Sequence, residues 1–208
     1  MAERKPIIYI VDDDVSVCKA LSLLLGTHGF TSETFTSAEG FLAFKHLKGP
    51  ACLLLDINLP GIDGLALQDA MAARQLSIPT IFLTGYGDVP KSVKAIKAGA
   101  VDFLLKPFTH TKLLDAISSA ITKSHTQNKK EAKVASIQKR IETLSPRELE
   151  VFRFVAQGLM NKQIASKRGT TLQTIKVHRG RVMQKMQAKT VTELIHLAHK
   201  AGITSSLD

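Results

Sequence analysis

The chain has no tryptophan, few aromatic residues and only two cysteines, and it lacks long apolar runs. These shortages limit the kinds of core and the classes of protein that the sequence can form. Aromatic residues make up 5% of the 208 residues, so any core must be built from aliphatic side chains. Cys18 and Cys52 cannot supply a disulfide framework or a four-ligand zinc site. The longest apolar runs, such as residues 23–25 and 53–55, are far shorter than the ~20 residues of a membrane span. No signal peptide precedes the first strand-like run, so we expect a cytoplasmic protein with no membrane partner.

Charge is distributed unevenly along the chain. Apolar residues make up 44% and charged residues 22%, which is the composition of a folded globular protein. The formal net charge is +10, but residues 1–125 hold 12 basic and 12 acidic side chains, whereas residues 126–208 hold 16 and 6. This asymmetry favours two units, the second of which binds a polyanion. A basic tail that only keeps the protein in solution is the alternative.

Residues 1–123 alternate short strand patterns with helix patterns. We expect strands at residues 7–11, 34–36, 51–55, 80–84 and 101–105, and helices at 15–25, after Ser37, near 64–73, at 89–98 and at 113–121. Strands without polar alternation are buried on both faces, as in a parallel sheet covered by helices. The expected fold is a flavodoxin-like, doubly wound sheet of five parallel strands.

The strand pattern ends after residue 123. Residues 124–140 are polar and contain no glycine or proline, so we expect a linker that partly continues the preceding helix. Residues 141–208 are predicted to form a small all-α domain of four helices, which begin at Ser145, Asn161, Thr171 and Thr190. The first and last of these starts are capping boxes, with Glu148 and Glu193 three residues on.

Polar side chains stand at the carboxyl ends of the expected strands. Asp12 and Asp13 follow the first strand, Asp56 the third, Thr84 the fourth and Lys106 the fifth. Parallel strands bring these ends to one edge of the sheet, where such folds bind ligands. Carboxylates held together need a cation, and Mg²⁺ takes hard oxygen ligands beside phosphoryl groups. A carboxylate there can attack a phosphoryl donor and form an aspartyl phosphate. Taken singly, each residue could instead be a helix cap, a strand end or a turn former.

Four segments resemble the receiver domain of two-component response regulators, namely Val11-Asp12-Asp13-Asp14, the run from Leu55 to Gly64, Leu83-Thr84-Gly85 and Leu105-Lys106-Pro107-Phe108. The resemblance covers about residues 6–122. It implies that a sensor histidine kinase phosphorylates Asp56.

The same resemblance implies roles for the neighbours of Asp56. Asp13, Asp56 and the backbone carbonyl of Asn58 would bind Mg²⁺, with Asp12 acting through water. Lys106 would pair with the phosphoryl group, and the Lys106–Pro107 peptide would be cis. Thr84 and Phe103 would be the switch residues, although Phe103 could equally be ordinary core packing of the fifth strand.

The helix after Thr171 carries an apolar stripe and a basic, exposed side. Ile175, Val182 and Met186 share one face, while Gln173, Val177, Gly180, Arg181 and Gln184 lie opposite. A short helix, a turn with glycine and this second helix form a helix-turn-helix pattern, in which the second helix enters the major groove of DNA. A solvated basic helix is the alternative.

Residues 144–198 resemble the LuxR-type helix-turn-helix, through Leu144-Ser145-Pro146-Arg147-Glu148, Gly158-Leu159, Asn161-Lys162-Gln163-Ile164-Ala165 and Thr174-Ile175-Lys176-Val177-His178. The resemblance implies double-stranded DNA as a partner, with Lys176 and Val177 facing bases. Candidates for contact with the DNA backbone are Lys162, Thr171, Thr174 and Arg179, and Arg181 is a further DNA-binding candidate. Arg168 and Thr170 depart from the aliphatic residues usual in the family.

As a whole the chain resembles a response regulator of the FixJ type. We therefore expect phosphorylation of Asp56 to alter the surface formed by residues 88–121, to favour a homodimer and to switch sequence-specific DNA binding, with RNA polymerase as a further partner. We expect Mg²⁺-dependent self-phosphorylation and no enzymatic turnover. One alternative is an aspartate-nucleophile phosphohydrolase, although Asn58 stands where its second carboxylate would be. The other is a constitutive DNA-binding protein whose receiver is only a docking module.

Overall fold

The computed structural model describes residues 5–44, 49–85 and 99–203. The chain divides into two compact units, Met1–Asn128 and Lys129–Asp208, which we call the sheet unit and the helical unit. The helix expected at residues 89–98 lies outside the described residues. Among the described helices, none combines the length and the apolar character that crossing a lipid bilayer requires.

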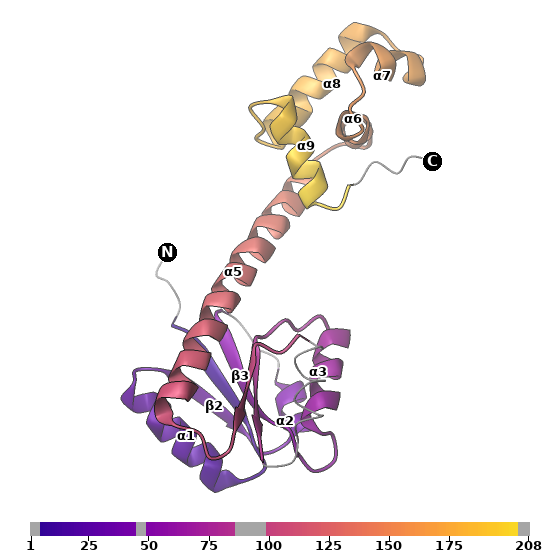
Figure 1. Ribbon diagram of the computed structural model, residues 1–208. Helices are drawn as coiled ribbons and strands as arrows, with labels where there is room; N and C mark the ends of the chain where they lie inside the picture. The colour runs from indigo at the N-terminus through magenta and orange to yellow at the C-terminus, as the bar shows by residue number, and fades with distance from the viewer. Residues whose placement is uncertain (1–4, 45–48, 86–98, 204–208) are drawn as a thin grey trace. The chain divides into compact units, whose positions relative to one another are not determined.

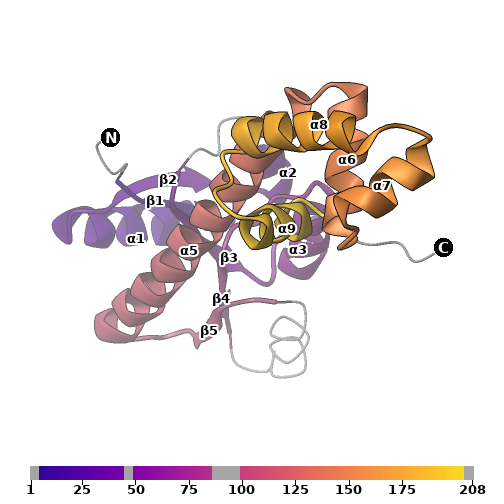
Figure 2. The same ribbon diagram turned by 90° about the horizontal axis from the view of Figure 1, so that it is seen from above.

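Five parallel strands form the sheet of the first unit (Figure 1), in the order β2-β1-β3-β4-β5, which the labels of Figure 2 follow. The strands are β1 (Ile7–Val11), β2 (Thr31–Phe35), β3 (Ala51–Asp56), β4 (Thr80–Thr84) and β5 (Asp102–Leu105). This order is the flavodoxin-like one, which confirms the predicted fold class. The order reverses between β1 and β3, so the carboxyl ends of these two strands mark the place where a ligand binds in such folds.

Helices cover both faces of the sheet. Helix α1 (Val15–Thr27) and the first part of α5 (His110–Glu142) pack on one face. Helices α2 (Ala38–Ala43) and α3 (Gly64–Ala73) pack on the other. Strands β1, β3 and β4 are buried on both sides, which explains their unbroken apolar runs.

The edge strand β2 was predicted too short. It spans Thr31–Phe35, whereas the sequence indicated residues 34–36. Its side chains are exposed or half-buried because the strand pairs with β1 on one side only. An edge strand of this kind needs no apolar run, so its first three residues, Thr31-Ser32-Glu33, gave no strand signal.

Helix α5 is longer than predicted, since it runs from His110 to Glu142 without interruption. Its first turns bury Leu113 and Ile117 in the sheet unit, and its last turns bury Ile137 and Ile141 in the helical unit. All of residues 124–140 are helical, where a partly helical linker was expected. Ser124 is buried, and its hydroxyl oxygen accepts a hydrogen bond from the backbone N–H of Ala51 at 3.0 Å.

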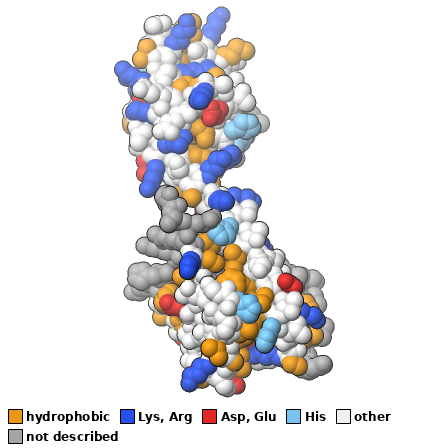
Figure 3. Space-filling model, turned by 90° about the vertical axis from the view of Figure 1, so that its left-hand side faces the viewer, with side chains coloured by type: hydrophobic (Ala, Val, Ile, Leu, Met, Phe, Trp, Pro, Cys, Tyr) orange, Lys and Arg blue, Asp and Glu red, His pale blue; other side chains and the backbone are white. Residues whose placement is uncertain are grey.

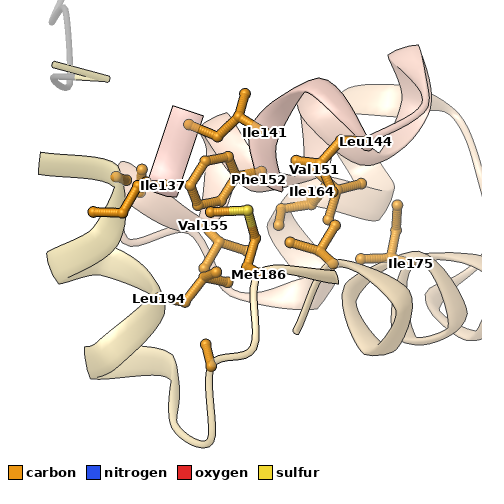
Figure 4. Packing of buried hydrophobic residues seen from close by; sticks show 14 of the residues in the cluster. Ile137, Ile141, Leu144, Val151, Phe152, Val155, Ile164, Ile175, Met186 and Leu194 are labelled. Carbon is orange, nitrogen blue, oxygen red and sulfur yellow. The ribbon is translucent and has the colours of Figure 1, made fainter. Parts of the chain in front are cut away.

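The helical unit contains α6 (Pro146–Ala156), α7 (Asn161–Arg168), α8 (Leu172–Lys185) and α9 (Val191–Lys200), and Figure 2 shows α7 and α8 joined by a short turn. Their apolar side chains and those of the last turns of α5 form one core. Figure 4 shows this core with side chains from all five helices, among them Ile141, Phe152, Ile164, Ile175 and Leu194. Met186 is fully buried there, as a flexible side chain that fills the remaining space.

The two predicted capping boxes differ in the structure. At α6 the Ser145 hydroxyl oxygen accepts from the Glu148 N–H, and the Glu148 carboxylate accepts from the Ser145 N–H at 2.8 Å, so this box is confirmed. At α9 the Thr190 hydroxyl oxygen accepts from the Glu193 N–H, but the Glu193 carboxylate accepts from the N–H of Lys189. The prediction of a second reciprocal box was wrong, because the carboxylate reaches one residue further back along the chain.

Candidate phosphorylation site and nucleic-acid interface

The carboxyl ends of three strands bring Asp12, Asp56 and Lys106 together. Asp12 follows β1, Asp56 ends β3 and Lys106 follows β5. The Lys106 ammonium lies 2.7 Å from Oδ2 of Asp12 and 2.9 Å from Oδ1 of Asp56. The Asp12 side chain is 1% exposed and the Asp56 side chain 10%. Two nearly buried carboxylates therefore share one ammonium group.

The environment of Lys106 keeps this side chain charged. Burial lowers the pKa of Lys106, but the hydrogen bonds to Asp12 and Asp56 and the charges of both carboxylates outweigh burial and raise it. The backbone also holds the residue, because the Lys106 N–H donates to the carbonyl oxygen of Thr84 at 2.7 Å. The Lys106–Pro107 peptide bond is cis, as the receiver resemblance implied.

Each oxygen of the Asp56 carboxylate has its own donor. Oδ1 accepts from Lys106, and Oδ2 accepts from the backbone N–H of Asn58 at 3.1 Å. Oδ1 of Asp12 accepts from the backbone N–H of Asp14 at 3.0 Å. These bonds orient both carboxylates at the edge of the sheet.

Asp13 and Asp14 differ although they are neighbours. Both are exposed. Asp14 is the N-cap of α1, where its carboxylate accepts from the hydroxyl and the backbone N–H of Ser16. These two hydrogen bonds lower the pKa of Asp14. Asp14 is thus engaged as a helix cap, whereas Asp13 is the exposed residue directly after Asp12.

The oxygen atoms around Asp56 are suitable ligands for Mg²⁺. Within the described residues, no three Asp, Glu, His or Cys side chains converge into a metal site by themselves. Mg²⁺ does not need such a cage, because it keeps several waters and binds one or two carboxylates together with phosphate oxygens. Asp12, Asp13, Asp56 and the backbone carbonyl of Asn58 are all hard oxygen donors at one edge of the sheet. This set fits a hydrated magnesium ion.

The two predicted switch residues occupy different environments. Thr84 ends β4, is fully buried, and its hydroxyl donates to the Gly85 carbonyl oxygen at 3.4 Å. Phe103 lies on the edge strand β5 and is 38% exposed, with Leu105 beside it at 42%, whereas Leu104 between them is buried. Phe103 lies on the same face of the sheet as its β4 partner Phe82, which is fully buried, but it is itself partly exposed because β5 is the edge strand. The interpretation of Phe103 as ordinary core packing is therefore wrong.

Gly64 is a positioning residue that the sequence analysis missed. It is the first residue of α3, and its N–H donates to the Ile57 carbonyl oxygen at 3.1 Å. A Cβ at this position would lie 2.4 Å from the backbone oxygen of Asp56 and 3.1 Å from the Phe82 ring. Only glycine allows α3 to pack this closely behind Asp56. A glycine one residue after the cap Asp63 was the available signal.

Helix α8 has the two faces that its sequence predicted. Ile175, Val182 and Met186 are buried in the core of the helical unit. The opposite face is exposed and consists of Gln173, Lys176, Val177, Gly180, Arg181 and Gln184. Val177 lies on this exposed face and is 45% exposed.

Three of the residues predicted to contact DNA form hydrogen bonds with other residues of the helical unit. Thr171 caps α8, and its hydroxyl oxygen accepts from the Thr174 N–H and lies 2.8 Å from the Thr174 hydroxyl. The Arg179 guanidinium donates to Oδ1 of Asn161 at 2.5 Å, which links α8 to the first residue of α7. Lys162, Lys176 and Arg181 are exposed.

Ion pairs connect the helices of this unit. The Arg168 guanidinium lies 2.7 Å from the Glu150 carboxylate of α6. This ion pair links the end of α7 to α6, at a position where the sequence analysis noted a departure from the aliphatic residues of the family. Lys185 lies 2.6 Å from Glu148, and this hydrogen bond together with that of the Ser145 N–H lowers the pKa of Glu148 to about 2. Lys and Arg side chains still outnumber acidic ones on the face of the helical unit seen in Figure 3.

Fold and site define the class as a receiver domain joined to a helix-turn-helix. Residues 8–118 match the response regulator receiver domain, and residues 142–198 match the bacterial regulatory proteins of the luxR family. The chain therefore belongs to the two-component response regulators with a LuxR-type DNA-binding domain. A protein of this class is a regulator of transcription, as the sequence predicted.

Particular relatives match nearly the whole chain. Nodulation protein W of Bradyrhizobium diazoefficiens is 41% identical over 205 residues, which are 99% of this chain and 90% of that protein. The transcriptional regulatory protein FixJ of the same organism is 41% identical over 196 residues, or 94% and 96% of the two chains. The solved structure of the response regulator StyR has a TM-score of 0.80 and 39% identity, and covers 95% of this chain and 100% of that one. The resemblance to regulators of the FixJ type is thus confirmed.

Proposed function

We propose that a sensor histidine kinase phosphorylates Asp56, and that this modification switches DNA binding by the helical unit. The observation that carries the proposal is the Lys106 ammonium, which contacts both Asp12 and Asp56 at the end of the sheet. A cation held 2.9 Å from the acceptor oxygen is placed to neutralise charge on an incoming phosphoryl group.

In the transfer, a carboxylate oxygen of Asp56 attacks phosphorus, and an O–P bond forms as the P–N bond of a phosphohistidine donor breaks. The Asn58 N–H and the Lys106 ammonium hold the carboxylate for this attack. Mg²⁺, when bound by Asp13, Asp56 and the Asn58 carbonyl, with Asp12 acting through water, supplies the positive charge that phosphoryl transfer requires. Lys106 then pairs with a phosphoryl oxygen in place of Asp56.

The modified site acts on a two-state receiver. Thr84 turns its hydroxyl to the phosphoryl group, and Phe103 moves from its exposed position toward the space that Thr84 leaves. The surface of residues 99–121 changes with them, while residues 88–98 of the expected surface lie outside the described residues. This change favours a homodimer, which would place two α8 helices on half-sites about one DNA turn apart.

These roles divide the chain into two domains and a linker. We assign residues 1–123 to the receiver, 124–140 to the helical linker and 141–208 to the DNA-binding domain. Lys176 and Val177 face bases, and Lys162, Thr171, Thr174, Arg179 and Arg181 contact the DNA. RNA polymerase is the expected downstream partner, and the cytoplasm, where the chromosome lies, is the expected compartment.

The test compares the parent chain with an Asp56→Ala variant. Beryllium fluoride with Mg²⁺ mimics the phosphoryl group, and its effect is measured on oligomer size and on affinity for a duplex selected by the parent. We expect dimerisation and tighter binding in the parent, and neither response in the variant. Equal binding with and without the mimic would instead establish a constitutive DNA-binding protein. Rapid turnover of a phosphate ester would establish a phosphohydrolase.

A further inference from the structure

The exposed face of α8 carries an uncharged strip made by Gln173, Val177 and Gly180. The three positions follow an i, i+4, i+7 spacing, so they lie in one line along the helix. The strip is opposite the buried residues Ile175 and Val182, and Lys176 and Arg181 flank it. In the major groove, the uncharged strip would face the base edges, and the basic residues on either side of it would face the two phosphate backbones.

Gly180 lies in the interior of α8, yet nothing within the described protein requires a glycine there. Its backbone is not in the left-handed region, and a Cβ built on it meets no atom within 4 Å. Glycine in a helix interior is less stable than alanine. The position is therefore unexplained by the fold and lies on the face that the proposed function directs to DNA. A residue without a side chain allows the helix backbone to approach a ligand closely.

We propose that Gln173, Val177 and Gly180 make α8 a reader of A·T pairs in each half-site. This inference rests on the proposed function of α8 as the recognition helix. A glutamine amide can bond N6 and N7 of adenine, and an apolar side chain packs on the 5-methyl group of thymine. Gln173 and Val177 are about 6 Å apart along the helix axis, which is close to two base-pair steps of ~3.4 Å each. Gly180 sets how deeply the helix lies in the groove.

The first experiment removes the thymine methyl group. Duplexes are selected from a random pool by the full chain with Mg²⁺ and beryllium fluoride, and each selected thymine is then replaced in turn by uracil. At one position we expect the parent to bind about four-fold more weakly, the value of one buried methyl group. Val177→Ala should lose no further affinity from that replacement, because its methyl contact is already gone. Gln173→Ala should relax the preference for adenine at a nearby position.

The second experiment uses Gly180→Ala. We expect the helical unit to melt several degrees higher, since alanine favours the helix. We also expect affinity for the selected duplex to fall at least ten-fold, with affinity for an unrelated duplex unchanged. Gly26→Ala in α1, where a Cβ also meets nothing within 4 Å, is the control and should leave DNA binding unchanged.

The outcomes separate this inference from the function on which it rests. If Gly180→Ala binds the selected duplex as tightly as the parent, or if uracil replaces every selected thymine without loss, the inference is overturned and the proposed function stands. If the parent selects no sequence in either phosphorylation state, sequence-specific DNA recognition fails together with it.

Discussion

Replacing Gly64 with alanine should destabilise the sheet unit and displace the backbone of Asp56. The new Cβ would lie 2.4 Å from the Asp56 carbonyl oxygen and 3.1 Å from the Phe82 ring. The nearest atom belongs to the backbone, so a change of rotamer cannot relieve the contact, and Phe82 is itself fully buried. Forcing an extra methyl group into a packed site costs about 1–3 kcal/mol.

Urea unfolding of the parent and Gly64→Ala, followed by circular dichroism, measures the cost. Binding of beryllium fluoride with Mg²⁺ measures the displacement, and we expect it to weaken because the backbone of Asp56 must move. Gly26→Ala is the matched control in the same unit, since its Cβ meets nothing within 4 Å and its stability should stay equal or rise. If Gly64→Ala is as stable as the parent and binds beryllium fluoride equally well, the proposed steric role of Gly64 is refuted.

Three further predictions concern polar contacts. Glu148→Gln should lower the free energy of unfolding by about 1–3 kcal/mol at pH 7. Because the folded pKa of Glu148 is lowered to about 2, this difference should persist above pH ~4.5 and shrink as the pH falls toward 2, which urea unfolding at several pH values would check. Lys106→Met should destabilise the sheet unit by about 1–3 kcal/mol without Mg²⁺, since two carboxylates lose their hydrogen-bond donor. The same variant should increase the thermal shift caused by added Mg²⁺. Ser124→Ala should cost about 1–3 kcal/mol because the buried Ala51 N–H loses its acceptor, whereas Ser118→Ala, at an exposed site on the same helix, should change the unfolding midpoint little.

Much of the sheet unit could be predicted because each central strand carries its own signal. The bounds of β1, α3 and β4 agree with the predicted ranges. Strand ends in a parallel sheet share one edge, so the approach of Asp12, Asp56 and Lys106 follows from topology. The signal weakens where burial is partial. The edge strand β2 was misjudged for that reason, and Phe103 was left between two interpretations until its exposure was known.

Other features depend on contacts between distant residues, which no local pattern reveals. The sequence shows that Arg179 is basic, but not that its guanidinium reaches Asn161 on another helix. It shows Gly64 at a helix start, but not the backbone of Asp56 pressed against it. The length of α5 is a different case. Residues 124–140 are rich in Lys, Glu, Gln and Ala, which favour helices, and that propensity was underestimated.

The central claim is that Asp56 receives the phosphoryl group, and chemical trapping tests it most directly. The chain is incubated with Mg²⁺ and acetyl phosphate and then reduced with borohydride, which converts an aspartyl phosphate into homoserine. Mass spectrometry of the peptides locates the converted residue. We predict homoserine at position 56 only, and none when Mg²⁺ is removed. Conversion of a different aspartate, or a chain that stays unmodified with Mg²⁺ and donor present, would contradict the account.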